Sequence, residues 1–276
     1  MRASLLLLLA VAVHAEAASV SGAGNVDIYF TRSGSGGANI ILVHGWICDS
    51  SYWRNQVAEL AADNTVIAID LAGHGESGSN RDNWSITAFG EDVAAVVDAQ
   101  NMDEVILVGH SMGGAVVIEA ARRLGQSVRL IVAVDTMQEP ARAPYTDEQS
   151  RELWAPFAAD FTNALEAFVR KSFFLPAAPP DMVNWVAKDM ASADADVALA
   201  AGHALTTWSV PDGISSINHI PFVLINADYR PTDAEGLASL HPDARLIVLS
   251  DVGHFPMLVK PEEFNAVLAS VIQSAP

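Results

Sequence analysis

A strand pattern that runs directly into a Gly-x-Ser-x-Gly motif constrains this chain more than any other feature. The apolar run Val105–Val108 leads into residues 109–113, Gly-His-Ser-Met-Gly, and a helical pattern follows at once. This order predicts a sharp strand-to-helix turn that holds the hydroxyl of Ser111 out at the end of a sheet. Gly109 and Gly113 suit such a turn, because it leaves no room there for a Cβ atom. Ser111 is therefore a candidate nucleophile.

Short apolar runs alternate with helical patterns along most of the chain. The runs predicted as strands are 39–43, 65–69, 105–108, 128–134, 222–225 and 246–249, with 26–31 as an edge strand. Helical patterns cover 52–62, 84–100, 111–124, 233–240 and the segment after residue 260. Because the strands carry little polarity, they predict an α/β fold with a mostly parallel sheet covered by helices on both faces.

One long segment interrupts this alternation. Residues 137–217 contain several helical patterns and eight Trp and Phe residues, but no strand pattern, and the sheet resumes at Phe222. We therefore predict a core made of residues 18–136 and 218–276, with an all-helical lid, 137–217, inserted over the strand ends. Most of the lid's aromatic side chains should pack internally, while one or two should line a pocket for an acyl or alcohol group.

The first 17 residues have the pattern of a signal peptide. Arg2 precedes a short apolar run, Leu5–Val13, and residues 15–17, Ala-Glu-Ala, form a small-x-small cleavage pattern. The run is too short to span a membrane, and no later run is long enough. We expect cleavage near Ala17 and a soluble protein that is periplasmic or secreted.

Charge and motif content argue against several classes of function. The net charge is −18, and removal of residues 1–17 leaves it unchanged because Arg2 and Glu16 cancel. Such a surface repels nucleic acid and anionic membranes. There is no Gly-x-Gly-x-x-Gly, Walker loop or cysteine cluster, so no cofactor is expected. The segment 70–77 matches no zinc spacing and is interpreted as structural. Cys48, the only cysteine, is interpreted as a small buried residue.

A serine nucleophile needs a base within hydrogen-bonding reach and an acid that orients the base. In hydrolases whose serine lies on such a strand-to-helix turn, the acid and the base follow the serine along the chain. The acid, Asp or Glu, comes first and the base, His, comes second. Among the histidines after residue 17, only His254 lies just past the last predicted strand, where a loop can carry it over the sheet. His254 is therefore the predicted base. His110, beside the serine, is expected to pack, and His44 belongs to the loop after residues 39–43.

Two aspartates end predicted strands between the serine and the histidine. Asp228 follows the strand directly before the last strand-loop-His unit, and Asp135 follows the strand at 128–134. Both satisfy the chain order, and we favour Asp228 as the acid with Asp135 as the alternative.

A tetrahedral intermediate also needs backbone N–H donors aimed at its oxyanion. One is expected from Met112, next to the nucleophile. The other is expected from Trp46, in a loop where Gly45 lets the backbone turn inward.

With these residues in place, the chain resembles the α/β-hydrolase superfamily from about residue 26 to its end. The similarity is carried by residues 44–46 (His-Gly-Trp), 70–77, 109–114, Asp228 and 253–255 (Gly-His-Phe). It is strongest to the lidded branch that contains small carboxylesterases, haloperoxidase-like perhydrolases, lactonases and C–C bond hydrolases. Because only one convincing strand precedes residue 39, we expect the superfamily's N-terminal hairpin to be shortened.

The resemblance implies Ser111 as nucleophile, His254 as base, Asp228 as acid, and Trp46 and Met112 as oxyanion donors. The implied activity is cleavage of carboxylic esters through an acyl-enzyme, with a lactone, amide or C–C bond as the alternative substrate. A non-catalytic binding protein on this fold is a weaker alternative, because all three triad positions are filled. The expected partner is a small-molecule acyl substrate, and the sequence carries no sign of an oligomeric state.

Overall fold

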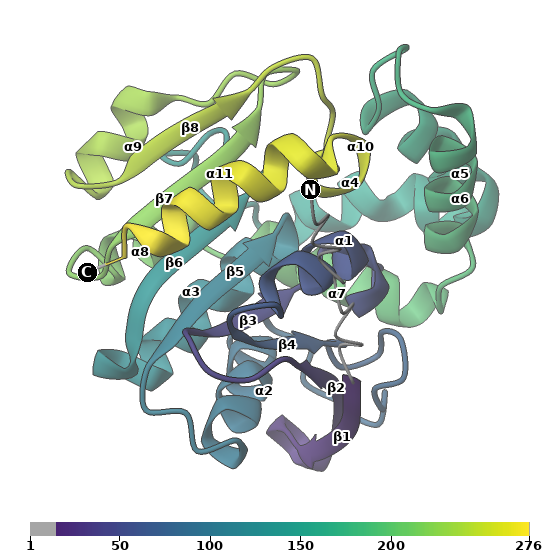
Figure 1. Cartoon of the computed structure of the whole chain (residues 1–276). Helices are drawn as coiled ribbons and strands as arrows, with labels where there is room; N and C mark the ends of the chain where they lie inside the picture. Colours follow the sequence, from purple (N-terminus) through teal and green to yellow (C-terminus); the bar gives the residue numbers. More distant parts are fainter. Residues whose placement is uncertain (1–14, 276) are drawn as a thin grey trace, which may run out of the picture.

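One eight-stranded sheet organises the molecule, shown as a computed structural model in which residues 15–275 are described (Figure 1). Its order is β1-β2-β4-β3-β5-β6-β7-β8; β1 and β2 are antiparallel to their neighbours, and the remaining pairs are parallel. The strands are β1 (Ala15–Ser21), β2 (Asp27–Ser33), β3 (Asn39–Val43), β4 (Thr65–Ile69), β5 (Val105–His110), β6 (Val128–Val134), β7 (Phe222–Ala227) and β8 (Arg245–Leu249). The predicted α/β fold with a mostly parallel sheet is confirmed.

The N-terminal hairpin is not shortened. Strand β1 pairs with β2 along its whole length, from Ala15 opposite Ser33 to Ser21 opposite Asp27. The sequence analysis missed β1 because the strand is almost wholly exposed and lacks an apolar alternation. The predicted cleavage point near Ala17 falls within this strand, and residues 1–14 lie outside the described residues. Over the described part of the chain, no helix is both long and apolar enough to cross a bilayer.

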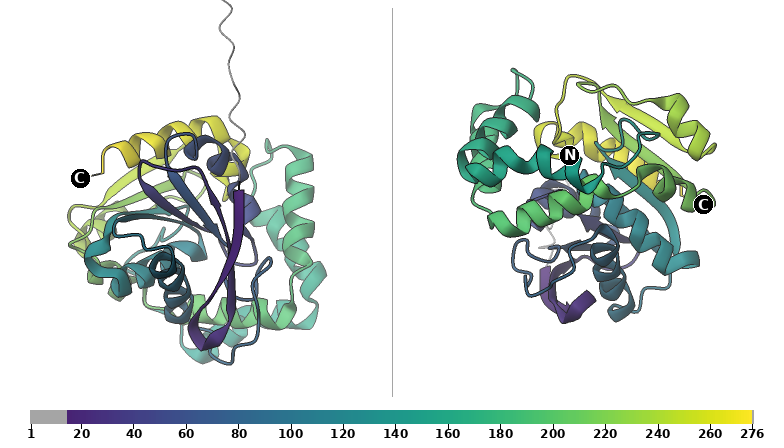
Figure 2. Two further views of the ribbon diagram at one scale, coloured as in Figure 1. Left: turned by 60° about the horizontal axis from the view of Figure 1, so that its bottom comes forward. Right: turned by 180° about the vertical axis from the view of Figure 1, so that it is seen from behind.

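Helices cover both faces of the sheet, as the turned views show (Figure 2). Helix α11 (Pro261–Gln273) packs beside α1 (Arg54–Leu60) on one face, and α2 (Ile86–Ala99) packs against α3 (Met112–Leu124) on the other. The short helices α9 (Ala234–Leu240) and α10 (Pro256–Val259) complete the core. Central strands β3 and β5 are buried throughout their apolar residues, which is why their sequences are continuously apolar rather than alternating.

Five helices occupy the chain between β6 and β7. They are α4 (Asp147–Ala159), α5 (Phe161–Ser172), α6 (Pro180–Ala191), α7 (Ala195–Thr207) and α8 (Val210–Ser216). We call residues 137–217 the helical insert. In Figure 1 its helices α4, α5 and α6 stand beside the sheet rather than on either face.

Three short side-chain hydrogen bonds are among those that fasten the helical insert to the core. The Trp208 indole donates to the Glu119 carboxylate on α3 at 2.8 Å. Trp46 of the core donates through its indole to the carbonyl of Ala198 on α7 at 2.7 Å. Both indoles would be costly to bury without such an acceptor. A third bond, from the Tyr52 hydroxyl to the Asp189 carboxylate on α6, is 2.8 Å long.

A buried carboxylate on α2, Asp92, binds both the loop before that helix and the turn of the first hairpin. The guanidinium of Arg81 lies 2.5 Å from the carboxylate of Asp92, and the two side chains are 2% and 0% exposed. The other Asp92 oxygen accepts the backbone N–H of Ala23, in the turn after β1. Burial raises the pKa of the Asp92 carboxyl to about 6 although Arg81 opposes the shift, so desolvation of this pair is costly.

Replacing Asp92 with Asn should destabilise the fold by about 3–5 kcal/mol, because Arg81 is left as a buried charge without its counterion. Asp98→Asn on the same helix is the matched control. Asp98 lies 3.8 Å from Arg123 and both side chains are more than half exposed, so its loss should cost less than about 1 kcal/mol. Denaturant unfolding measures both values. Equal effects would contradict the role given to the buried pair.

Candidate active site

Ser111 lies at a strained turn between β5 and α3. Its φ of 52° is in the left-handed region, which a serine adopts only where the surrounding structure enforces it. Its N–H donates to the carbonyl of Val134 on β6 at 2.9 Å. A Cβ on Gly109 would lie 2.1 Å from the carbonyl oxygen of Gly113, and one on Gly113 would lie 2.5 Å from that of Val43. Both glycines are therefore required sterically, as the motif indicates.

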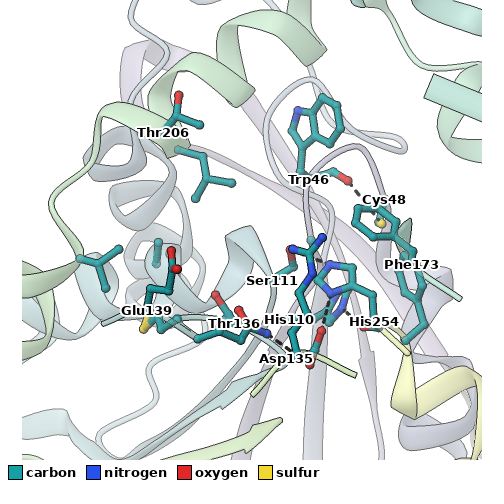
Figure 3. A pocket seen from close by; sticks show the side chains of 18 of the residues that line it. Trp46, Cys48, His110, Ser111, Asp135, Thr136, Glu139, Phe173, Thr206 and His254 are labelled. Atoms are coloured by element: carbon teal, nitrogen blue, oxygen red, sulfur yellow. Dashed lines mark hydrogen bonds and ion pairs between the residues drawn. The ribbon is translucent and has the colours of Figure 1, made fainter. Parts of the chain in front are cut away.

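His254 reaches the serine from the loop between β8 and α10. Its Nε2 lies 2.9 Å from the Ser111 Oγ, and the ring faces it in Figure 3. The backbone N–H of His254 donates to the carbonyl of Phe173 at 2.8 Å, and the Phe173 ring stacks on the imidazole with centroids 4.4 Å apart. A Cβ on Gly253 would lie 2.3 Å from that carbonyl oxygen, so glycine permits the approach.

The carboxylate against His254 belongs to Asp135. Its Oδ2 lies 2.5 Å from the His254 Nδ1, and the Asp135 side chain is fully buried. The other oxygen accepts the backbone N–H of Ala227 at 2.9 Å. Because a carboxylate only accepts, Nδ1 carries the proton, which leaves Nε2 as the acceptor for the Ser111 hydroxyl.

The Asp135 turn is held from the neighbouring strand. Asp135 has a φ of 44°. The Asn226 side chain on β7 accepts the N–H of Thr136 at 3.2 Å and donates to its carbonyl at 2.9 Å. Both bonds fix the backbone directly after the carboxylate.

The preference for Asp228 as the partner of His254 is corrected by this geometry. The Asp228 side chain is exposed and accepts the backbone N–H of Asp251 at 3.1 Å. The sheet register explains the difference. His110 of β5 pairs with Val134 of β6, so Ser111 and the alternative acid Asp135 follow at the same level. Asp228 lies further out along its strand, where its backbone continues the ladder to β8.

Two other histidines near the site lie where a base could not act on Ser111. His110 donates from Nε2 to the carbonyl of His254 at 2.7 Å, which supports the loop that carries the predicted base. Burial, followed by the nearby His254, holds the pKa of His110 well below its usual value. The Nε2 of His44 accepts the N–H of Leu71 at 2.9 Å, and burial also lowers the pKa of His44. Both rings are therefore neutral packing groups at neutral pH.

The two residues expected to supply oxyanion donors, Trp46 and Met112, lie beside Ser111 in the pocket and in the chain, respectively. Gly45 and Trp46 line the same pocket as Ser111, and a Cβ on Gly45 would lie 3.1 Å from the Ser111 Cβ. Met112 is the first residue of α3, and the first N–H groups of a helix have no acceptor within the helix. The placement of both residues is compatible with donation to an oxyanion.

Cys48 lines the same pocket, but its chemistry differs from that of a nucleophile. The thiol is buried and donates to the carbonyl of Trp46 at 3.5 Å. Burial, reinforced by two nearby carboxylates, raises the pKa of the Cys48 thiol, so it stays protonated at neutral pH.

A cavity of about 650 Å³ opens over Ser111 between the sheet and the helical insert. In Figure 3, Trp46, Cys48 and Phe173 lie on one side of the serine and Glu139 on the other. The apolar lining residues, which we call the apolar wall, include Trp46, Trp154, Phe168, Phe173, Met190 and Leu205, and the polar lining residues include Gln138, Glu139, Arg142 and Arg230. The volume is that of a small-molecule site.

The side chain of Asp70 holds the 70–77 segment. The two Asp70 oxygens accept the N–H groups of Ser50 at 2.8 Å and Glu76 at 2.9 Å. Within residues 15–275, no group of three or more His, Cys, Asp or Glu side chains is placed to hold a metal ion.

Known proteins with similar sequences and structures include esterases and a lactone-degrading enzyme. The pimeloyl-[acyl-carrier protein] methyl ester esterase of Aromatoleum aromaticum is 26% identical over 85% of this chain and 98% of its own length. An esterase from Exiguobacterium antarcticum superposes with a TM-score of 0.83 at 22% identity, over 93% of this chain and 99% of its own. An enzyme described as degrading N-acyl homoserine lactones superposes with a TM-score of 0.79 at 26% identity, over 92% and 99% of the two chains.

The match to a described family is more extensive than any local motif. Residues 40–267 match the alpha/beta hydrolase family. This range contains most of β3, the turn at Ser111, the Asp135 turn and the His254 loop. Since this is most of the 276 residues, the chain belongs to the α/β-hydrolase family.

Proposed function

We propose that this protein is a serine hydrolase that cleaves carboxylic esters of small molecules through an acyl-enzyme. The observation that carries the proposal is the continuous chain of contacts from the Ser111 hydroxyl through His254 to the buried carboxylate of Asp135. A pocket of small-molecule size opens onto the serine. The esterase names among the similar proteins support the same reaction.

The geometry supports a two-step reaction. The Ser111 Oγ attacks the ester carbonyl while Nε2 of His254 takes its proton, and the Trp46 and Met112 amides stabilise the oxyanion. Asp135 holds the imidazole in the productive tautomer and stabilises the imidazolium. The intermediate collapses as His254 returns the proton to the departing alcohol. Water then attacks the acyl-enzyme by the same route, which releases the acid and restores Ser111.

A lactone is the second candidate substrate. The likeness to the enzyme that degrades N-acyl homoserine lactones favours it, and the same triad chemistry applies. In a lactone the alcohol stays tethered to the acyl group, so one hydroxy acid is the only product. Parallel assays on nitrophenyl esters and lactones, followed by product mass, distinguish the two.

A fluorophosphonate probe tests the reaction class directly. The wild-type protein should be labelled stoichiometrically at Ser111 and should hydrolyse nitrophenyl esters, whereas Ser111→Ala should do neither. Labelling at another residue, or full esterase activity in Ser111→Ala, would refute the proposal.

Asp135→Asn should lower ester turnover by about 10⁴-fold, because an amide at this position favours the wrong imidazole tautomer. Asp228→Asn is the matched control and should stay within about threefold of wild type, since its carboxylate meets only the Asp251 backbone. Steady-state kinetics on one nitrophenyl ester, with Ser111→Ala as the background rate, measures both. The reverse order of effects would return the acid role to Asp228.

Trp154→Leu should weaken selectivity for long acyl chains. Trp154 lines the apolar wall, with its ring centroid 4.7 Å from that of Trp46. Loss of about 50 Å² of apolar contact corresponds to about a tenfold lower kcat/KM for an octanoate ester, and an acetate ester should be almost unaffected. Leu153→Ala, at a neighbouring side chain that is 44% exposed, should change neither value. An equal loss on both esters would place Trp154 outside the acyl site.

We also propose that the protein is exported, on the pattern of residues 1–17 alone. Expression in a bacterial host with its natural N-terminus should give a mature chain that begins near Ala18 outside the cytoplasm. N-terminal mass analysis of the fractionated protein checks this. A full-length cytoplasmic chain would contradict export.

A further inference from the structure

Asp135 holds a donor that the reaction scheme above does not use. Besides His254, its Oδ2 accepts the hydroxyl of Tyr229 at 3.1 Å. Tyr229 comes from the loop after β7, whereas Asp135 follows β6 and His254 follows β8. One carboxylate oxygen is therefore shared between the candidate base and a tyrosine from a third strand end.

We infer that Tyr229 is a positioning residue for this triad: its hydroxyl restrains the Asp135 carboxylate and limits how strongly that carboxylate attracts the imidazolium of His254. The inference rests on the proposed function. It concerns a residue that lines the pocket and that acts through the acid rather than on the acyl group.

The direction of the tyrosine hydrogen bond follows from its neighbours. The Tyr229 hydroxyl lies 3.3 Å from the His254 Nδ1 as well as 3.1 Å from Asp135. Nδ1 already carries the proton that points at Asp135, so it cannot accept. The tyrosine proton is therefore directed to the carboxylate. Burial, followed by the charge of Asp135, raises the pKa of Tyr229, so the hydroxyl keeps its proton at neutral and moderately alkaline pH.

The hydrogen bond from Tyr229 affects both the orientation and the charge of the Asp135 carboxylate. On the other oxygen, the Ala227 N–H fixes one edge of the carboxylate at 2.9 Å. Tyr229 fixes the second oxygen, so the plane of the group is held from both sides. A donor that bonds to an ionised carboxylate also draws on its negative charge. Without it, Asp135 would hold the His254 proton more firmly, and the base would become free only at higher pH.

The effect of Tyr229 on His254 can be distinguished from the effects of the other groups that face the imidazole. The His110 ring is tilted by 50° against the His254 ring at a centroid distance of 4.7 Å, and it is neutral because burial lowers its pKa. The remaining ring neighbours, Phe173 and Phe255, are uncharged. The ionisable side chains that line the pocket further out are Cys48, Glu139, Arg142 and Arg230, and the Arg230 guanidinium lies 5.6 Å from the Tyr229 ring.

Tyr229→Phe tests the inference, because it removes only the hydroxyl. The measurement is the rate of Ser111 labelling by a fluorophosphonate as a function of pH. In the variant the acid limb should move to higher pH by about 0.5 unit, since one hydrogen bond to the carboxylate is lost. The labelling rate on the alkaline plateau should fall by less than about tenfold.

Tyr145→Phe is the matched control. Its hydroxyl meets Arg142 rather than the triad, so the limb should stay at the wild-type pH. If the acid limb of the Tyr229→Phe profile stayed at the wild-type pH or moved to lower pH, the inference would be overturned, even if thermal stability fell. If wild-type Ser111 were not labelled at all, the proposed function itself would fail, which is a different outcome.

Discussion

The hydrogen bond between Asp135 and His254 is the contact on which the rest of the site depends. It lies at the carboxyl ends of parallel strands, and the Asp135 side chain has no exposure to water. A buried carboxylate is tolerated only when its oxygens are satisfied. Here the partners come from the end of β7 and from the loop after β8. The order of strands in the sheet therefore supplies the donors that stabilise the buried charge of Asp135 next to Ser111.

Backbone strain is concentrated at the same edge. Ser111 and Asp135 both have positive φ, and each directly follows a residue of the paired strands β5 and β6. Such conformations are unfavourable for residues with a Cβ, so neighbouring contacts must hold them. The hydrogen bond from the Ser111 N–H to the Val134 carbonyl holds the first turn, and the Asn226 side chain holds the second. The two side chains project from one edge because β5 and β6 are parallel and end in register.

The sequence could predict the parts of the site that depend on local order. The strand before Ser111 and the helix after it are adjacent in the chain, so the motif alone placed the serine. His254 was identifiable because it follows the last strand. The choice between Asp135 and Asp228 depended on inter-strand register, which no local pattern encodes. Strand β1 was missed for a related reason: its side chains are exposed, and only pairing with β2 defines it.

The loop after β7, which carries Asp228 and Tyr229, has a different role from the one that the chain order predicts. Asp228, the acid expected from chain order, and Tyr229 are adjacent in a loop, and their side chains meet different partners. Asp228 binds the backbone near β8, while Tyr229 reaches across to Asp135. The loop after β7 therefore contributes a proton donor to the carboxylate instead of supplying the carboxylate. Asp135 follows the strand beside Ser111, and Tyr229, in the loop after β7, donates to its carboxylate from the next strand end.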